Sequence, residues 1–270
     1  MKKAAAPEGL LPDTPAQEAA RRWFAWRVAE VQRQAGRAAH ACEPGPVHDL
    51  RVSLRRLRAA VALFGKRDVR RLESALAKTQ KTAGALRELH VGRELRERLG
   101  AGGRPEDEHT RLLDKHARKL SLSLAKLNSK TLPKLTRAME AQELAGKLAG
   151  HRLRARLAKL VVTCESRLDD ARTLEPKAAH ALRISLKKLR YTAELLVPAF
   201  PAAMQALIAA LVPLQDGLGA LHDLDVLLEL AEGPLRADAQ RERAALVATL
   251  GKQLAEWTRS GRLSAMRRAL

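Results

Sequence analysis

The stretch VHDLRVSLRRLRAAVALF, Val47–Phe64, indicates the fold class of this 270-residue chain. On a helix with about 100° per residue, Leu50, Leu54 and Leu57 fall within an apolar stripe about 60° wide. Helical periodicity continues over almost the whole sequence, and no strand-like alternation stands out. The sequence is also rich in Leu, Ala, Arg, Lys and Glu, a composition typical of helices. We therefore predict an all-α protein.

Proline and glycine residues separate the predicted helices into two similar series. The first series covers about residues 15–41, 47–64, 68–99 and 106–127, and Pro133 then interrupts a short tail. The second series covers about residues 141–172, 177–197 and 201–232, and a last helix ends near Thr258. A kink is expected at Pro213, because proline removes a helical hydrogen bond.

The second series repeats motifs of the first. The segment His48–Arg58 matches His180–Arg190 at an offset of 180 − 48 = 132 residues. Further matches are Arg22 with Arg154 and Arg27 with Lys159 at this offset, and Gly84–Leu86 with Gly219–Leu221 at an offset of 135. We predict that residues 15–140 and 141–270 form two four-helix bundles related by pseudo-two-fold symmetry, the product of an internal duplication. Residues 1–14 are predicted to be a flexible N-terminal segment.

Each copy of the repeated segment carries a basic stripe beside its apolar one. In the first copy the stripe is about 80° wide on a helical projection, and it consists of His48, Arg51, Arg55 and Arg58. Arg56 lies outside it. In the second copy the corresponding residues are His180, Arg183, Lys187 and Arg190, and Lys188 replaces Arg56.

Two explanations of these stripes are open. The chain has 50 Lys and Arg against 30 Asp and Glu, a net charge of +20, and like charges three or four residues apart destabilise a helix. The cations could pair with carboxylates on neighbouring helices. Alternatively, they could bind a polyanion, and the basic-for-basic replacement of Arg55 by Lys187 and of Arg56 by Lys188 favours this second explanation.

The sequence contains no recognisable catalytic motif, and no cofactor is expected. Two histidines without carboxylate or thiol ligands at a fixed spacing make a weak metal site, so no metal is predicted. They could instead be structural or respond to pH near phosphate. Asp223 and Asp225 diverge on a helix and are expected to pair with basic side chains.

A reducing, cytoplasmic location is expected from the sequence. Cys42 and Cys164 do not form a disulfide framework, and the N-terminus lacks the apolar region of a signal peptide. No apolar run approaches about 20 residues, so no segment is expected to span a membrane.

The doubled His-x-x-Arg-x-x-x-Arg/Lys-Arg/Lys-Leu-Arg motif resembles the CHAD domain family, over about residue 15 to the C-terminus. Each copy is followed by a segment of the Leu-Gly-x-x-x-Asp-x-Asp type, from which Arg87–His90 departs. The resemblance implies a single domain of two four-helix bundles with a basic cavity or groove that binds inorganic polyphosphate. The residues that it implies for binding are His48, Arg51, Arg55, Arg56 and Arg58, with His180, Arg183, Lys187, Lys188 and Arg190, and additionally Arg22, Arg27, Arg154 and Lys159.

These observations together predict a non-enzymatic protein that binds inorganic polyphosphate and associates with polyphosphate granules. Phosphate or sulfate would mimic the polymer. Nucleic-acid backbone binding is a secondary possibility, because one Tyr, three Phe and three Trp offer few stacking platforms. A third possibility is an adaptor whose basic face docks an acidic protein. No membrane partner is expected.

Overall fold

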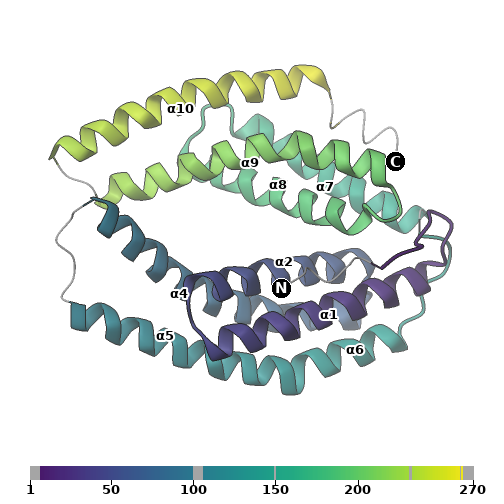
Figure 1. Ribbon diagram of the computed structural model, residues 1–270. Helices are drawn as coiled ribbons and strands as arrows, with labels where there is room; N and C mark the ends of the chain where they lie inside the picture. The colour runs from purple at the N-terminus through teal and green to yellow at the C-terminus, as the bar shows by residue number, and fades with distance from the viewer. Residues whose placement is uncertain (1–6, 100–105, 149, 231–232, 262, 264–270) are drawn as a thin grey trace. The chain divides into compact units, whose positions relative to one another are not determined.

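The computed structural model describes residues 7–99, 106–148, 150–230, 233–261 and 263, which form helices and no β-strand (Figure 1). The predicted all-α class is therefore confirmed. In chain order the helices are α1 Ala16–His40, α2 Pro44–Phe64, α3 Arg67–Arg71, α4 Glu73–Leu99, α5 Glu106–Lys126, the π-helix η1 Leu127–Thr131, α6 Leu132–Ala141, α7 His151–Asp170, α8 Pro176–Leu196, α9 Pro201–Leu230 and α10 Gly233–Ser260. Residues 1–6 of the predicted flexible segment lie outside the described residues.

The helices belong to two compact units. Unit 1 consists of Met1–Leu10 and Thr14–Lys147, with α1 to α6, and unit 2 of Leu11–Asp13 and Leu148–Leu270, with α7 to α10. The pseudo-two-fold duplication stays a prediction.

Unit 1 is a helical bundle centred on α2. Helix α2 packs between α1 and α4, α4 packs on α5, and α6 returns to α1. Leu50, Leu54 and Leu57 are fully buried, as the apolar stripe predicts. Trp23 of α1 stacks on Phe64 at the end of α2, with ring centroids 5.4 Å apart. Burial of such side chains stabilises the bundle by about 1.5–3 kcal/mol each.

Unit 2 is centred on α8 in the same manner. Helix α8 packs against α7 and α9, and α10 packs on α9. The second apolar stripe, Leu182, Leu186 and Leu189, is fully buried in a leucine-rich core. Helices α9 and α10 approach closely at Gly217, where an added Cβ would lie 2.5 Å from Leu250 Cδ2. Gly217 therefore allows these two helices to pack together.

Several predicted helix boundaries were wrong because prolines begin helices here rather than separate them. Pro44 and Pro176 each occupy the first turn of a helix, where the missing N–H would have had no helical partner. The chain likewise passes Pro133 without a break, because η1 leads directly into α6 and Pro133 lies in its first turn. Helix α9 also continues through Pro213, and the expected kink stays a prediction.

Residues 141–150 are not the start of a long helix, as the sequence predicted. The chain leaves the helical conformation at Gln142, and Gly146 has φ +83°, a conformation that favours glycine. The Ala16 amide donates to the Gly146 carbonyl at 2.8 Å, which holds this segment against the start of α1. The predicted helix 68–99 is also divided, because α3 ends at Arg71 and α4 begins at Glu73.

Gln142 joins the end of α2 to the end of α6. Its side-chain amide donates to the Phe64 carbonyl at 3.2 Å, and its Oε1 accepts from the Lys66 amide at 2.8 Å. Gln142 is 9 % exposed. One buried side chain thus satisfies backbone groups on both sides of Gly65, where α2 ends.

Helix α9 is apolar enough, by length and composition alone, to cross a membrane over Pro201–Glu229, with mean hydropathy 1.3. The expectation that no apolar run approaches about 20 residues was therefore wrong. Leu211, Leu214 and Leu218 of α9 are buried between α8 and α10. In all, 33 % of the apolar window is buried inside the structure.

Candidate functional site

Helices α2 and α8 present the two basic stripes predicted from the sequence. We call His48, Arg51, Arg55 and Arg58 the unit 1 stripe, and His180, Arg183, Lys187 and Arg190 the unit 2 stripe. The two helices are built alike on their buried sides. Ser53 Oγ donates to the Leu50 carbonyl at 2.8 Å, and Ser185 Oγ donates to the Leu182 carbonyl at 2.8 Å. Both serines are buried, so their hydroxyl groups are not part of the basic face of either helix.

The cations of the unit 1 stripe differ in their ion pairs. Arg58 donates to Glu73 Oε1 at 2.5 Å and to Gln80 Oε1 at 2.9 Å, both on α4. Arg55 is half-buried and has no ion pair with any residue that the structure describes. Arg51 and Arg56 are also half-buried. The explanation by carboxylate pairing therefore holds for Arg58 and fails for Arg55.

The unit 2 stripe also contains a cation beside a carboxylate. Arg190 lies 3.4 Å from Glu194 Oε1 and 5.3 Å from the Tyr191 ring centroid. The Arg183 guanidinium lies over Gly219 of α9, where an added Cβ would be 3.8 Å from its Nε. A methyl group at Gly219 would make only an ordinary contact with this arginine, and no other described helix lies within 4 Å of that position. Lys187 is half-buried, and Lys188, outside the stripe, is exposed.

The histidine of each stripe lies in a positive field. Burial lowers the pKa of His48 from its ordinary value, and Arg87, Arg51 and Arg55 lower it further against the opposing effect of Asp49. Partial burial is also the largest cause that lowers the pKa of His180, and His222, Arg183 and Lys187 lower this pKa further. Cations disfavour a further positive charge. Both stripes therefore favour the approach of an anion.

The four additional binding residues predicted on α1 and α7 differ in their burial and contacts. Arg27 is 4 % exposed, and its guanidinium lies 3.5 Å from the Trp26 ring centroid, a contact that stabilises a desolvated cation. Arg22 contacts Glu18 at 3.4 Å and the Glu8 carbonyl. The other two residues, on α7, are exposed; they are Arg154 and Lys159. Arg27 thus belongs to the interior of unit 1 and not to its exposed basic surface.

Sequence reasoning did not assign two residues that lie beside the stripes. Arg87 of α4 acts on His48, and His222 of α9 has its ring centroid 5.1 Å from that of His180. They are matched at the offset of 135 residues that relates Gly84 to Gly219. That offset was the signal that could have found them.

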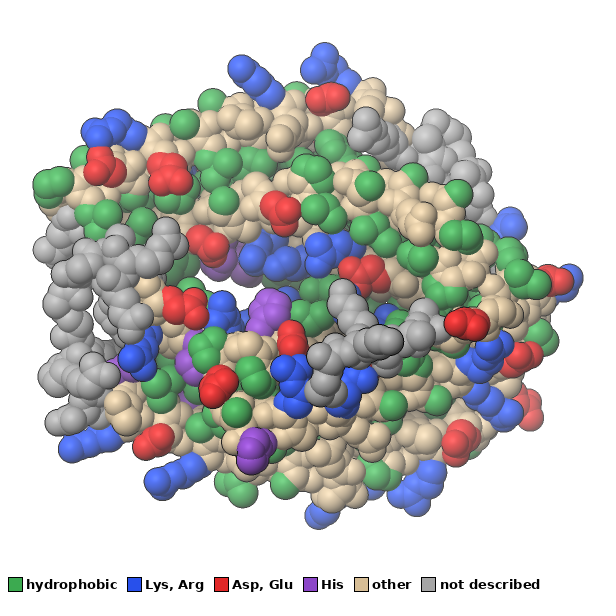
Figure 2. Space-filling view, viewed as in Figure 1, with side chains coloured by type: hydrophobic (Ala, Val, Ile, Leu, Met, Phe, Trp, Pro, Cys, Tyr) green, Lys and Arg blue, Asp and Glu red, His purple; other side chains and the backbone are tan. Residues whose placement is uncertain are grey.

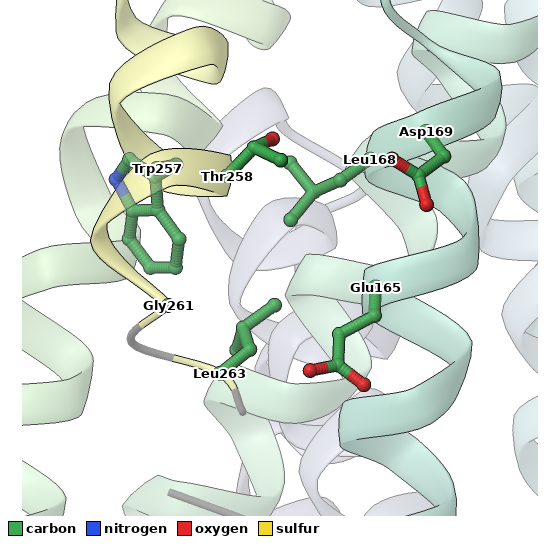
Figure 3. Close-up of a pocket in the computed structure, with 7 residues that line it drawn as sticks. All are labelled: Glu165, Leu168, Asp169, Trp257, Thr258, Gly261 and Leu263. Carbon is green, nitrogen blue, oxygen red and sulfur yellow. The ribbon is translucent and has the colours of Figure 1, made fainter. Parts of the chain in front are cut away.

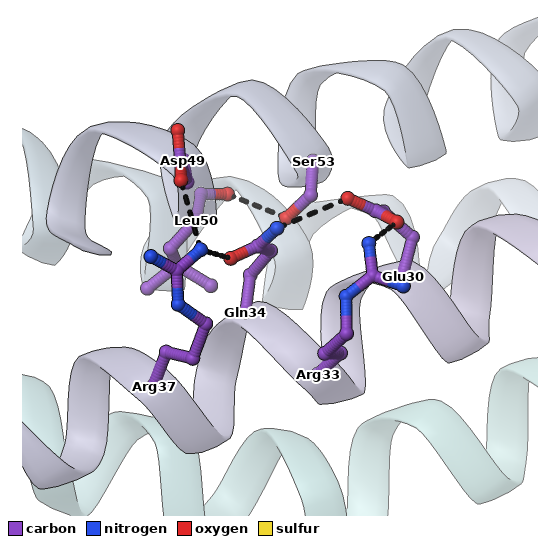
Figure 4. A network of polar contacts seen from close by, with 7 residues as sticks. All are labelled: Glu30, Arg33, Gln34, Arg37, Asp49, Leu50 and Ser53. Carbon is purple, nitrogen blue, oxygen red and sulfur yellow. Dashed lines mark hydrogen bonds and ion pairs between the residues drawn. The ribbon is translucent and has the colours of Figure 1, made fainter. Parts of the chain in front are cut away.

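Three acidic residues near the stripes are already neutralised within their units. In unit 1, Arg37 Nη1 donates to Asp49 Oδ2 at 3.0 Å and to Gln34 Oε1 at 2.9 Å (Figure 4). The Gln34 amide donates to Glu30, which also pairs with Arg33. In unit 2, Arg243 of α10 pairs with Asp225 at 2.6 Å, which confirms the predicted pairing of Asp225 with a basic side chain.

A pocket of about 290 Å³ lies elsewhere in unit 2, between α7 and the end of α10 (Figure 3). Its lining consists of Glu165, Leu168, Asp169, Trp257, Thr258, Gly261 and Leu263. The two carboxylates repel an anion, so this pocket does not extend the unit 2 stripe. Among the described residues no group of three or more His, Cys, Asp or Glu could hold a metal ion.

Cationic and acidic side chains are interspersed along α10 in Figure 2. They include Arg236, Asp238, Arg241 and Glu242, and Arg241 pairs with Asp238. Such alternation is typical of a solvated helix face. The stripes of α2 and α8 lack it, because Asp49 is the one acid between His48 and Arg58, and no acid lies between His180 and Arg190.

Comparisons with known proteins agree with this architecture. A family model described as "CHAD domain" matches residues 22–232. A similar solved structure is the crystal structure of the CHAD domain from the plant Ricinus communis, which has a TM-score of 0.64, 23 % sequence identity, and coverage of 98 % of this chain and 96 % of that chain. The similarity to this crystal structure shows that the two chains share a fold. The comparison with curated proteins found no match. Because the family model covers most of the sequence, the chain belongs to the CHAD domain family.

Proposed function

We propose that this protein binds inorganic polyphosphate, without chemically changing it, through the unit 1 and unit 2 stripes. CHAD domains are associated with polyphosphate binding. The observation that carries the proposal is the positive field at both histidines, to which Arg55 contributes in unit 1 and Lys187 in unit 2. A chain of phosphates offers the repeated negative charge that would offset this field.

The aromatic residues favour polyphosphate over single-stranded nucleic acid. Base stacking needs exposed rings. Five of the seven aromatic side chains are buried: Trp23, Phe24, Phe64, Tyr191 and Trp257. Trp26 is half-buried, and the Arg27 guanidinium already covers one face of its ring. A phosphate polymer needs only point charges, which suits the exchange of Arg55 for Lys187 between the stripes.

A charge-reversal experiment tests the proposal. The variant Arg55→Glu with Lys187→Glu changes one matched residue in each stripe. The control, Lys134→Glu with Lys252→Glu, changes two exposed lysines on α6 and α10 and alters the net charge equally. Titration with long-chain polyphosphate at fixed salt should show a loss of affinity of more than about tenfold in the first variant alone. Equal losses in both variants would mean that only net charge matters and would refute the proposed site.

Two further arms of the experiment separate the alternatives. Circular dichroism of each variant measures whether the helices remain. Competition between polyphosphate and duplex DNA or RNA at equal phosphate concentration identifies the preferred polyanion. Preference for nucleic acid would overturn the proposal in favour of backbone binding. Binding of neither polymer would favour an acidic protein as the partner.

The cooperation of the stripes also has a direct test. If both stripes contact one polymer, long chains should bind more tightly than short ones, because successive phosphates are tethered. Variants of one stripe, Arg55→Glu alone or Lys187→Glu alone, should then lose this chain-length preference. A preference that persists in both single variants would show that each stripe binds independently.

The proposed absence of catalysis and the proposed location need separate measurements. Incubation with polyphosphate should release no orthophosphate above the buffer blank. In bacterial cells a fluorescent fusion should lie in the cytoplasm and collect at polyphosphate granules. The foci should disperse in cells that lack the polymer, whereas unchanged foci would indicate a protein partner.

A further inference from the structure

The unit 2 stripe begins with a pair of histidines from two helices. His180 lies in the first turns of α8 and is exposed, and His222 lies on α9 and is half-buried. Their ring centroids are 5.1 Å apart and the rings are tilted by 51°. Two neutral rings tolerate this distance, whereas two protonated rings repel each other unless an anion lies close to both.

The charges nearest this histidine pair are positive. His222, Arg183 and Lys187 all act on His180, and no carboxylate opposes them. Three carboxylates of the packed helices are engaged elsewhere: Asp225 of α9 with Arg243 of α10 at 2.6 Å, and, beside the end of α7, Asp169 with Arg172 at 2.8 Å and Asp170 with Arg167 at 2.9 Å. Asp223 of α9 is exposed, and Glu175 and Lys177 flank the start of α8. His180 is therefore predominantly neutral at neutral pH in the free protein.

Unit 1 has a permanent cation where unit 2 has a titratable one. Arg87, the residue matched to His222, acts on His48 and stays protonated at all physiological pH values. It also contacts Glu94 at 3.4 Å. The two units thus carry the same stripe with different neighbours, one fixed in charge and one that changes with pH.

We propose that His180 and His222 together form a phosphate subsite in unit 2, which takes up protons when a phosphate polymer binds. This inference rests on the proposed function. A bound phosphate group offers acceptor oxygens to both rings and supplies the negative charge that each imidazolium needs. Binding then favours the protonated pair, and the affinity of unit 2 for the polymer rises as the pH falls.

The size of the effect follows from proton linkage. Each unit by which the polymer raises the pKa of a histidine contributes up to about tenfold in affinity, reached at a pH below both the free and the bound pKa. A rise of about one unit at both rings gives up to about 100-fold between pH 8.5 and pH 5.5. His48 and the end groups of the polymer also titrate in this range. Comparison of variants removes their contribution, because it is present in every variant.

The test compares the affinity for long-chain polyphosphate at pH 5.5 and at pH 8.5. His180→Gln with His222→Gln should reduce the ratio of the two affinities by at least about tenfold relative to the unchanged protein. His40→Gln, which removes an exposed histidine at the end of α1, is the control and should leave the ratio unchanged. His222→Arg places a fixed cation at this position, as in unit 1, so it should bind more tightly at pH 8.5 and show a smaller ratio.

A direct measurement complements the affinities. NMR titration of the His180 and His222 ring protons should show that saturating polyphosphate raises both pKa values. An unchanged ratio in the double variant, or unchanged ring pKa values in the complex, would overturn the inference while leaving polyphosphate binding intact. Failure of the unchanged protein to bind polyphosphate at any pH would instead refute the proposed function, and this inference with it.

Discussion

Neutralising one cation in each stripe should change the salt dependence of polyphosphate binding by a predictable amount. Arg55 has no ion pair with any described residue, and Lys187 is its match in unit 2. The variant Arg55→Gln with Lys187→Gln would remove two of the proposed phosphate contacts without reversing a charge. Arg58 is less suitable, because its replacement would also leave Glu73 without its partner.

The magnitude follows from counterion release. By analogy with single-stranded nucleic acid, each phosphate contact contributes about −0.7 to the slope of log K against log salt. Loss of two contacts should make the slope shallower by about 1.4. If the contacts contribute nothing at 1 M salt, the affinity falls about 70-fold at 0.05 M, about 14-fold at 0.15 M and about 3-fold at 0.5 M.

Isothermal titration calorimetry or fluorescence anisotropy at four or more salt concentrations measures this slope. The control Lys134→Gln with Lys252→Gln should retain the slope of the unchanged protein. A uniform loss of affinity with an unchanged slope would show that Arg55 and Lys187 do not contact phosphate. An equal change of slope in the control would show that the charges act through the overall field rather than at the stripes.

Three predictions concern the packing and the thiols. Gly217→Ala should be less stable to urea than Gly219→Ala, with a free energy of unfolding lower by about 1–3 kcal/mol. The methyl group added at Gly217 would collide with a buried leucine of α10, whereas the one added at Gly219 would make an ordinary 3.8 Å contact. Equal stabilities of the two variants would contradict the close packing of α9 and α10. Leu186→Ala, at a fully buried position of α8, should cost about 2–5 kcal/mol in the same assay, and a cost below about 1 kcal/mol would place this side chain outside the core. Burial raises the pKa of Cys164 to about 11, so about 0.1 % of this side chain is thiolate at pH 8. Mass spectrometry after iodoacetamide treatment should therefore find Cys42 modified first and Cys164 modified only after denaturation.

The sequence predicted the two central helices well because their patterns are local. Leu50 and Leu186 are buried where the 3.6-residue period places them, and the cations follow the adjacent stripe. The errors at Pro44, Pro176 and Pro133 have a common cause. Proline is compatible with the first turn of a helix and incompatible with its interior, and the sequence pattern alone did not distinguish these two positions.

Contacts between helices were the part that periodicity could not predict. The burial of Arg27 depends on its neighbours in unit 1, and one helical projection does not contain them. Arg87 and His222 reach the histidines from other helices, so their roles require the packing of α4 on α2 and of α9 on α8. The contact of Gly219 with the Arg183 side chain likewise depends on how α9 packs on α8.

The position of Gln142 in the sequence has a consequence for biosynthesis. Its two backbone partners, Phe64 and Lys66, precede it by 78 and 76 residues. A ribosome adds about 5–20 residues each second, so for several seconds the nascent chain contains the end of α2 without the amide group that completes it. Unit 1 therefore cannot acquire all of its native buried hydrogen bonds until α6 has been translated, and a fragment released before that point would lack them permanently.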